Sequence, residues 1–303
     1  MTDPNGSGSV MSKSWQSQIN GKINGKTRRF GARSAIFAMV LLVPVVTTLF
    51  VTGCQQVPES GRKRLVLLSS ESKENEMGLT AYKEVLETEK VTSNQSYVEM
   101  VRRVGNRIAA VANRPDFDWE FNVIESETQN AFCLPGGKVA VYTGILPVCK
   151  DEAGLAVVMS HEVAHAIARH GGERMTYQTA QNLGKAAVGY VTQTQDEQKQ
   201  KIVLAAYGAA SEYGVILPYS RTHELEADSI GIMLMARAGY DPSSAPEFWQ
   251  RFAEMKEGGQ PMEWMSTHPS DSTRSANLRE LVPQAVQLYE KSPQKFGLGE
   301  PIR

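Results

Sequence analysis

The pentad His161-Glu162-Val163-Ala164-His165 constrains this chain more than any other stretch of its sequence. On an α-helix, residues i and i+4 lie on one face, with their Cβ atoms roughly 5–6 Å apart. Both imidazoles can then converge on one Zn²⁺ through bonds of about 2.0–2.1 Å. Glu162 lies about 100° round the helix, where it can accept a proton from an attacking water. The pattern predicts a catalytic zinc site, and the alternative is two core histidines beside a surface glutamate.

The residues around the pentad indicate a buried helix. Residues 155–159 are apolar on every side, which is typical of a helix with no solvent face. Asp151 and Glu152 suit the start of this helix. Arg169 and His170, which two glycines follow, suit its end, with His170 as a partner of the helix dipole. Two imidazoles and a carboxylate are costly to bury unless something pairs them, so this context favours a metal ion.

A catalytic zinc usually takes a third protein ligand, which the pentad does not supply. The extended pattern HExxHxxGxxH fails here, because Ala168 and Gly171 stand where its glycine and third histidine should be. A second predicted helix, between residues 218 and 239, offers carboxylates instead. Glu224 and Asp228 share one of its faces, so Glu224 could bind the metal while Asp228 orients a ligand histidine. The other interpretation of this acidic run is a solvated helix face.

Three further motifs accompany the pentad in a fixed order. Asn-Ala-Phe-Cys-Leu-Pro-Gly-Gly occupies 130–137, Ser-Arg-x-x-Glu-x-x-Ala-Asp occupies 220–228, and Thr-His-Pro-Ser occupies 267–270. With these motifs the chain resembles, over about 76–281, the gluzincin zinc metallopeptidases of the HtpX and CAAX prenyl endopeptidase type. Among these, the periplasmic lipoprotein members of the LoiP and BepA kind look most similar. The resemblance implies a zinc endopeptidase.

By this resemblance, His161, His165 and Glu224 bind one zinc ion per chain, and Glu162 is the general base. The family's equivalent of His268 lies near the metal. It either donates a hydrogen bond to the oxyanion or fills the open metal position in the resting enzyme. The alternative for His268 is a surface turn histidine before a proline.

Arg274 and two cysteines leave alternatives open. Arg274 either orients the segment that carries His268, or assists the oxyanion, or is an ordinary exposed arginine. Cys133 and Cys149 form a disulfide if an oxidising compartment and their geometry permit it, and are two buried thiols otherwise. A cysteine nucleophile is not indicated, since no basic partner is suggested near either thiol.

Residues 1–53 are predicted to be a bacterial lipoprotein signal peptide, in which 1–10 are an upstream extension. A basic segment precedes the apolar run 35–50, and the Val-Thr-Gly-Cys that follows resembles a lipobox with Cys54 as the lipidated residue. Gln55 after that cysteine favours the outer membrane, with the protein facing the periplasm. The alternative is an inner-membrane anchor by an uncleaved helix, since the apolar run is just long enough to span.

The rest of the chain is long enough for one sizeable core. We expect a mainly helical α+β fold: a zincin-like metallopeptidase domain with one small sheet and an HExxH active-site helix. The domains predicted are a tether over 54–75, the zinc metallopeptidase domain over 76–291 and a tail over 292–303. Further elements are expected as two helices over 76–112, two over 173–217 that break near 192–201, helices over 241–257 and 278–291, and strands over 119–123 and 138–142 joined as a hairpin or meander.

The function predicted is zinc-dependent hydrolysis of misfolded periplasmic or outer-membrane proteins. Polypeptide substrates, a membrane reached through the lipid anchor, and the outer-membrane protein assembly machinery are the expected partners. The formal net charge of −1 gives no reason to expect nucleic acid. One alternative is an outer-membrane assembly factor that binds client proteins and keeps zinc for structure or regulation. Another is a metal-dependent hydrolase of a non-peptide amide, because the motif alone does not identify the amide.

Overall fold

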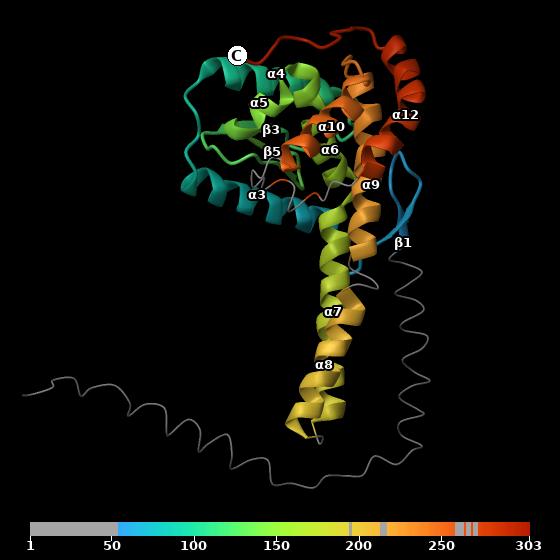
Figure 1. The fold of residues 1–303 in the computed structure, drawn as a ribbon. Coiled ribbons are helices and arrows are strands. Elements are labelled where there is room, and N and C mark those ends of the chain that lie inside the picture. The colour runs from blue at the N-terminus through green and yellow to red at the C-terminus, as the bar shows by residue number, and fades with distance from the viewer. Residues whose placement is uncertain (1–53, 194–195, 213–216, 258–263, 265–267, 269–271) are drawn as a thin grey trace, which may run out of the picture. The chain divides into compact units, whose positions relative to one another are not determined.

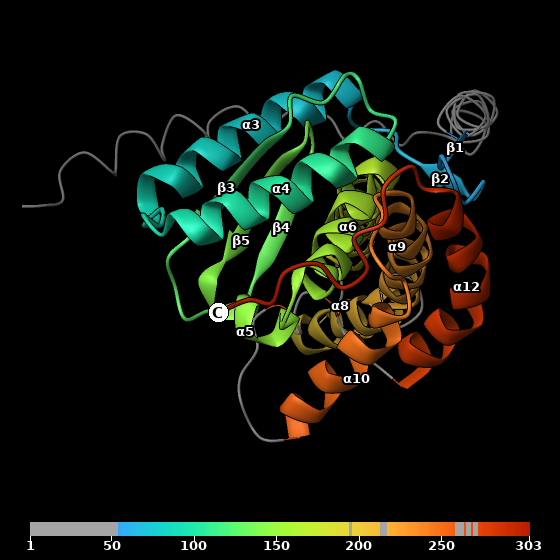
Figure 2. The same cartoon turned by 90° about the horizontal axis from the view of Figure 1, so that it is seen from above.

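The computed structural model describes residues 54–193, 196–212, 217–257, 264, 268 and 272–303. The predicted signal peptide, its upstream extension and the alternative membrane helix all lie outside these residues. Helices make up most of the described chain, and a three-stranded sheet lies beside them (Figures 1 and 2). The prediction of a mainly helical α+β fold is therefore confirmed. Within the described ranges, no helix has both the length and the apolar character needed to cross a bilayer.

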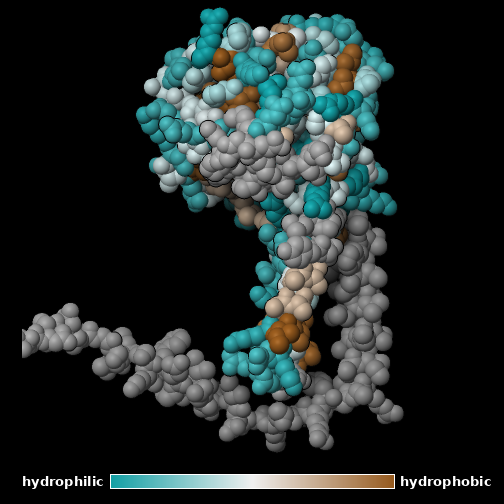
Figure 3. All heavy atoms as spheres, viewed as in Figure 1, coloured by the Kyte–Doolittle hydropathy of each residue, from teal (hydrophilic) through white to brown (hydrophobic). Residues whose placement is uncertain are grey.

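Two helices begin five and six residues before their predicted starts at 76 and 278, and the others begin closer to prediction, including the two that a polar stretch separates. These two, α7 and α8, pack on each other and leave large apolar side chains exposed, which Figure 3 shows in brown. The helices are α3 Glu71–Thr88, α4 Gln95–Val111, η1 Thr143–Ile145, α5 Leu146–Cys149, α6 Glu152–Ala168, α7 His170–Thr192, α8 Glu197–Ser211, α9 Leu217–Arg237, α10 Ser244–Glu257 and α12 Ser272–Lys291. The strands are β1 Cys54–Gln56, β2 Lys63–Leu65, β3 Glu120–Ile124, β4 Ala131–Leu134 and β5 Lys138–Tyr142.

The three-stranded sheet has the strand order β3-β5-β4. β4 and β5 form an antiparallel hairpin, in which Cys133 lies opposite Val139. Its turn contains Gly136 and Gly137 with φ of 86° and 82°, a region that glycine enters without strain. β3 pairs directly with β5 in parallel, so these two strands do not form the expected hairpin or meander. The chain that connects them passes through β4, on the other side of β5. This order leaves β4 at an edge, where it packs against α6 (Figure 2).

Residues 54–75, for which a tether is predicted, contain a second small sheet. β1 and β2 pair in antiparallel fashion, with Gln55 opposite Arg64. The Arg64 side chain is buried and donates to the Ile167 carbonyl at 3.2 Å, at the end of α6. We call residues 54–66 the N-terminal strap. The described chain thus holds two small sheets where one is predicted, because a three-residue strand has too short a pattern to signal itself.

Helix α6 lies in the interior, and all of its 17 residues except His165 are buried. Asp151 caps its start by accepting from the Gly154 N–H at 2.8 Å. Arg169 ends it with a left-handed φ of 55°. The Arg169 guanidinium donates to Glu74 at 2.8 Å from both Nε and Nη2. These contacts fix the two ends of α6, the helix that carries the pentad.

The predicted tail, 292–303, returns to the start of α6. The backbone N–H groups of Glu152 and Ala153 donate to the carbonyls of Glu300 and Leu298, each at 3.0 Å. The first N–H groups of a helix have no partner within the helix itself. The tail therefore completes the hydrogen bonding of α6 at the end opposite to the cap formed by Arg169.

Helix α9 crosses α6 at Gly231, directly beside the pentad. A Cβ built at Gly231 would lie 3.1 Å from the backbone nitrogen of His161 and 3.2 Å from its Cα. These are backbone atoms of a buried helix, which cannot rotate aside as a side chain can. The missing side chain at this position thus allows the close approach that brings Glu224 of α9 toward His161.

We expect Gly231→Ala to lower the free energy of unfolding by about 1–3 kcal/mol, as overpacking of a tight contact does. Urea unfolding measures this loss. The matched control is Gly208→Ala on α8, where an added Cβ meets nothing within 4 Å. That variant should be neutral or slightly stabilising, since alanine favours a helix more than glycine does. An unchanged stability of Gly231→Ala would mean that α9 can shift without cost.

Candidate metal centre

Four side chains from three parts of the chain converge beside α6. The group consists of His161, His165, Glu224 and His268, whose possible ligand atoms all lie within 4.8 Å of one another. The Nε2 atoms of the two α6 histidines are 3.1 Å apart. Glu224 places Oε2 at 3.3 Å from His161 Nε2 and Oε1 at 3.5 Å from His165 Nε2. His268 places Nδ1 at 3.3 Å from His161 Nε2 and 3.1 Å from Glu224 Oε2.

These separations fit a zinc ion. A tetrahedral Zn²⁺ with bonds of about 2.0–2.1 Å holds its ligand atoms about 3.3–3.4 Å apart. The five separations given above run from 3.1 to 3.5 Å and lie around that value, with Glu224 offering Oε2 to His161 and Oε1 to His165. Imidazole nitrogen and carboxylate oxygen are also donors that zinc accepts. The structure therefore brings together the three predicted ligands, and His268 adds a fourth donor atom.

Glu162 lies beside this group and is held by an aromatic side chain. Trp264 donates from Nε1 to Glu162 Oε1 at 2.8 Å, and His268 Nε2 lies 3.4 Å from the same oxygen. The indole of Trp264 is itself stacked on Trp249, with ring centroids 5.1 Å apart. Glu162 is thus fixed next to the convergent donors, where a base that activates water would have to be.

Asp228 and Arg274 lie beside His161, and Arg274 also reaches Glu224. Asp228 Oδ1 is 3.0 Å from His161 Nδ1, so it accepts that N–H and leaves Nε2 for a metal. Arg274 donates to Asp228 from Nε and Nη2, both at 2.7 Å, and Nη1 is 3.1 Å from Glu224 Oε2. Its guanidinium lies 3.6 Å from the ring centroid of Trp249, and the residue is 2% exposed. The alternative of an ordinary exposed arginine is therefore wrong.

The charges around the site shift several pKa values. Burial by itself would lower the pKa of His161, but its hydrogen bonds to Asp228 and Glu224 raise that pKa to about 9. Burial lowers the pKa of His165 well below its ordinary value. Burial would raise the pKa of Glu224, but His165 and the other nearby histidines lower it. Burial would also raise the pKa of Asp228, which Arg274 lowers. Both carboxylates are therefore charged at neutral pH, so Glu224 is in the ionised form in which a carboxylate binds a metal.

A second group of buried polar residues lies behind His165, and sequence reasoning missed most of it. His170 Nδ1 is 2.7 Å from His165 Nδ1, and its Nε2 is 2.9 Å from Glu226 Oε2. The His170 ring stacks on His223, with centroids 4.2 Å apart, and His223 Nε2 is 3.0 Å from Glu173 Oε2. All five histidines of the chain thus belong to one connected group.

Helical spacing in the sequence predicts part of this second polar group. His223 and Glu226 are three residues apart and share a face of α9, and His170 and Glu173 have the same spacing on α7. Nothing in either pattern shows that the two faces meet. Arg62, which lies in the segment predicted to be a tether, contacts both acidic residues, Glu226 and Glu173.

The two remaining cysteines are buried and free. Cys133 and Cys149 are both buried thiols, and burial raises the pKa of each. Of the two alternatives left open by the sequence, the structure therefore has buried thiols and not a disulfide. Their protonated state at neutral pH gives neither thiol the character of a nucleophile.

A mainly helical fold that carries such a group of donors beside a glutamate is that of a zinc-dependent metallopeptidase. Peptidase family M48 matches residues 96–282, more than half of the chain, and the chain belongs to this family. The predicted membership of a zinc metallopeptidase family is thereby confirmed, and the protein is a zinc metalloprotease.

Individual relatives are named for the same activity. The chain is 39% identical over 252 residues to the mitochondrial metalloendopeptidase OMA1 of Schizosaccharomyces pombe, covering 80% of this chain and 71% of that protein. It is 30% identical over 252 residues to the mitochondrial metalloendopeptidase OMA1 of Homo sapiens, covering 80% of this chain but 48% of that protein. It is 32% identical over 186 residues to a putative β-barrel assembly-enhancing protease of Vibrio cholerae, covering 60% and 38%.

These relatives overturn one prediction. The bacterial outer-membrane location facing the periplasm is wrong, because proteins that match 80% of this chain are mitochondrial. The predicted contact with the outer-membrane assembly machinery depends on that location and loses its basis with it. Lipidation of Cys54, which lies at the first residue of β1, stays a prediction.

Proposed function

We propose that this chain is an endopeptidase that holds one zinc ion on His161, His165 and Glu224 and cleaves unfolded polypeptides. The observation that supports this most is the convergence of these ligand atoms, five of whose separations are 3.1–3.5 Å and so lie near those around a tetrahedral ion. The relatives' names support endopeptidase action. When bound, zinc supplies the Lewis acidity that polarises the peptide carbonyl. Glu162 takes a proton from the attacking water and delivers it to the leaving amine.

We infer that the substrate binds as an extended strand along β4. This strand is one of the two edges of its sheet, and it packs against α6, which carries the pentad. A peptide can pair with such an edge through its backbone. Backbone pairing requires little of the substrate's amino-acid sequence, but it requires that the paired segment of the substrate be extended. Unfolded chains offer such segments, and folded proteins rarely do.

We further propose that His268 caps the site in the resting enzyme. Its Nδ1 stands among the ligand atoms, 3.1 Å from Glu224 Oε2, while its Nε2 lies 3.4 Å from Glu162 Oε1. The imidazole therefore fills the space between the ligands and the base. Water and the substrate carbonyl need that space, so His268 has to move before cleavage. This geometry favours the capping role over the hydrogen bond to the oxyanion.

Metal removal is the direct test. We expect the purified full chain to contain about one zinc ion and to digest unfolded casein. The chelator 1,10-phenanthroline should stop digestion, and added Zn²⁺ should restore it. The non-chelating isomer 1,7-phenanthroline is the matched control and should have no effect. A protein that holds no zinc, or digestion that survives the chelator, would contradict the proposal.

A further inference from the structure

A line of buried polar contacts leads away from the candidate metal centre, and the reaction proposed above makes no use of it. The line starts at His165, passes through His170 and Glu226, and ends at Arg62 and Ser60 in the N-terminal strap. His170 is 2% exposed and Glu226 is 7% exposed. Buried polar groups of this kind are costly unless each one has a hydrogen-bond partner.

The donor in each hydrogen bond follows from the zinc site. If His165 turns Nε2 to the metal, its Nδ1 carries the proton and donates to His170 Nδ1 across 2.7 Å. His170 then accepts at Nδ1 and carries its own proton on Nε2. That proton is donated to Glu226 Oε2 across 2.9 Å. One set of tautomers thus satisfies every nitrogen in the line, and it ends on a carboxylate.

The strap holds the outer end of this line through Arg62. The Arg62 Nε donates to Glu226 Oε2 at 2.7 Å, and its Nη1 and Nη2 donate to Glu173 at 3.1 and 2.7 Å. Ser60 Oγ donates to the other oxygen of Glu226. Glu173 also accepts from the Leu65 N–H at 3.2 Å. One guanidinium therefore balances two buried carboxylates and fixes the Glu226 oxygen that His170 contacts.

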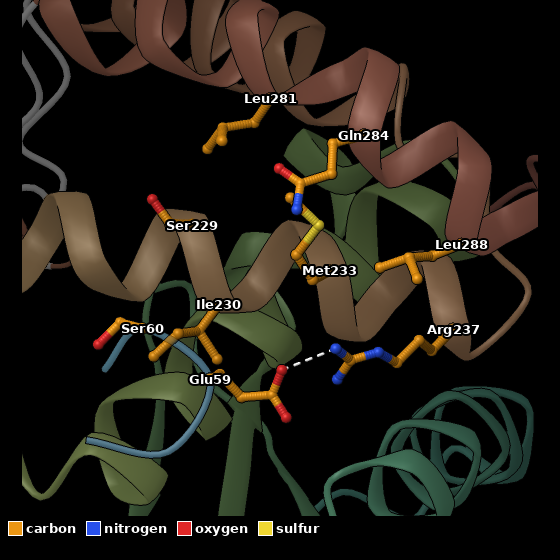
Figure 4. Close-up of a pocket in the computed structure, with 9 residues that line it drawn as sticks. All are labelled: Glu59, Ser60, Ser229, Ile230, Met233, Arg237, Leu281, Gln284 and Leu288. Carbon is orange, nitrogen blue, oxygen red and sulfur yellow. Dashed lines mark hydrogen bonds and ion pairs between the residues drawn. The ribbon is translucent and has the colours of Figure 1, made fainter. Parts of the chain in front are cut away.

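A second contact of the strap lies outside the line. Figure 4 shows Glu59 paired with Arg237 beside a pocket of about 270 Å³ between the strap, α9 and α12. The pair has a separation of 2.7 Å, and its side chains are 31% and 32% exposed. Such partly exposed pairs contribute little to stability. This pair offers a way to disturb the strap without touching His170 or Glu226.

We propose that His170, Glu226 and Arg62 are positioning residues for zinc, so that the N-terminal strap is part of the metal site. The inference rests on the proposed zinc site. A ligand histidine commonly donates its second N–H to a carboxylate, and such partners affect metal affinity. His161 has Asp228 directly in this role, whereas His165 reaches its carboxylate through the imidazole of His170. Both carboxylates come from α9, so the same helix that supplies Glu224 would also orient both histidine ligands.

The test measures the zinc affinity of the full chain by competition with a chromogenic chelator, and the thermal unfolding of each variant. We expect His170→Ala to weaken zinc binding about 10–100-fold. His170→Asn keeps an acceptor close to the position of Nδ1 and should recover part of this loss. Arg62→Ala should weaken zinc binding as well. Glu59→Gln, the matched control on the strap, should stay within about twofold of the wild type.

A folded His170→Ala variant with the zinc affinity of the wild type overturns the inference. Equal losses in Arg62→Ala and Glu59→Gln also overturn it, since the strap would then act by general docking. If His170→Ala does not fold, Arg62→Ala decides, and an unchanged zinc affinity of that variant overturns the inference. A wild type that binds no zinc overturns the proposed function too, so the two failures are distinguishable.

Discussion

Replacing Glu162 with glutamine should abolish peptide cleavage while the protein keeps its zinc. Glutamine has the size of glutamate and can still accept the hydrogen bond that Trp264 donates at 2.8 Å. Its amide cannot take a proton from water, however, so the general base is lost. General-base catalysis contributes about 10²–10⁴-fold, so we expect residual activity of about 1% or less. Casein digestion and zinc content, measured on one preparation, check both parts of this prediction.

The exposed Glu197 on α8 provides the matched control, because Glu197→Gln makes the same chemical change far along the chain from the pentad. Its digestion rate should equal that of the wild type. Unchanged turnover in zinc-loaded Glu162→Gln would refute the assignment of the base. Full complementation of a deletion strain by Glu162→Gln would instead favour the alternative of a client-binding protein, since binding needs no proton transfer.

The parts of this site that were predictable from sequence are those that helical periodicity determines. His161 and His165 are four residues apart on α6, and Glu224 and Asp228 are four apart on α9, so each pair shares a face. Their spacing therefore predicts which side chains can act together within one helix. That the two faces meet follows from no local rule, and the acidic pair needed the family resemblance as additional support.

The parts that were missed depend on contacts between distant segments. Arg62 lies between the two strands of the strap, and its half-buried position results from contacts with Glu173 and Glu226, which are more than 100 residues away. Trp264 has no periodic pattern around it, yet it holds Glu162. The parallel pairing of β3 with β5 was missed for the same reason, because strand order is a tertiary property that alternation along one strand does not encode.

Arg274→Ala should have the largest effect on stability among the substitutions considered. Arg274 is 2% exposed, donates to Asp228 twice at 2.7 Å, and lies 3.1 Å from Glu224. Removing it leaves both carboxylates buried with one cation fewer. Breaking a buried ion pair in this way costs about 3–5 kcal/mol, because the charge left behind has lost both its partner and its water. Urea unfolding of the variant and the wild type measures the loss.

Zinc should change the size of this loss, which separates electrostatics from packing. A bound cation would partly neutralise Glu224, so the destabilisation should be greater in chelator-treated protein than in zinc-loaded protein. Arg274→Lys keeps the positive charge but lacks the planar guanidinium, whose N–H groups contact two carboxylates at once. It should therefore recover only part of the stability that Arg274→Ala loses. The exposed Arg279 lies on the same helix, and Arg279→Ala should change the free energy of unfolding by less than about 0.5 kcal/mol. The Arg274 guanidinium lies 3.6 Å from the ring centroid of Trp249, so it also fills space there. An equal loss of stability for Arg274→Ala with and without zinc would show that Arg274 acts by this packing. It would contradict the role of balancing the carboxylates of the metal site.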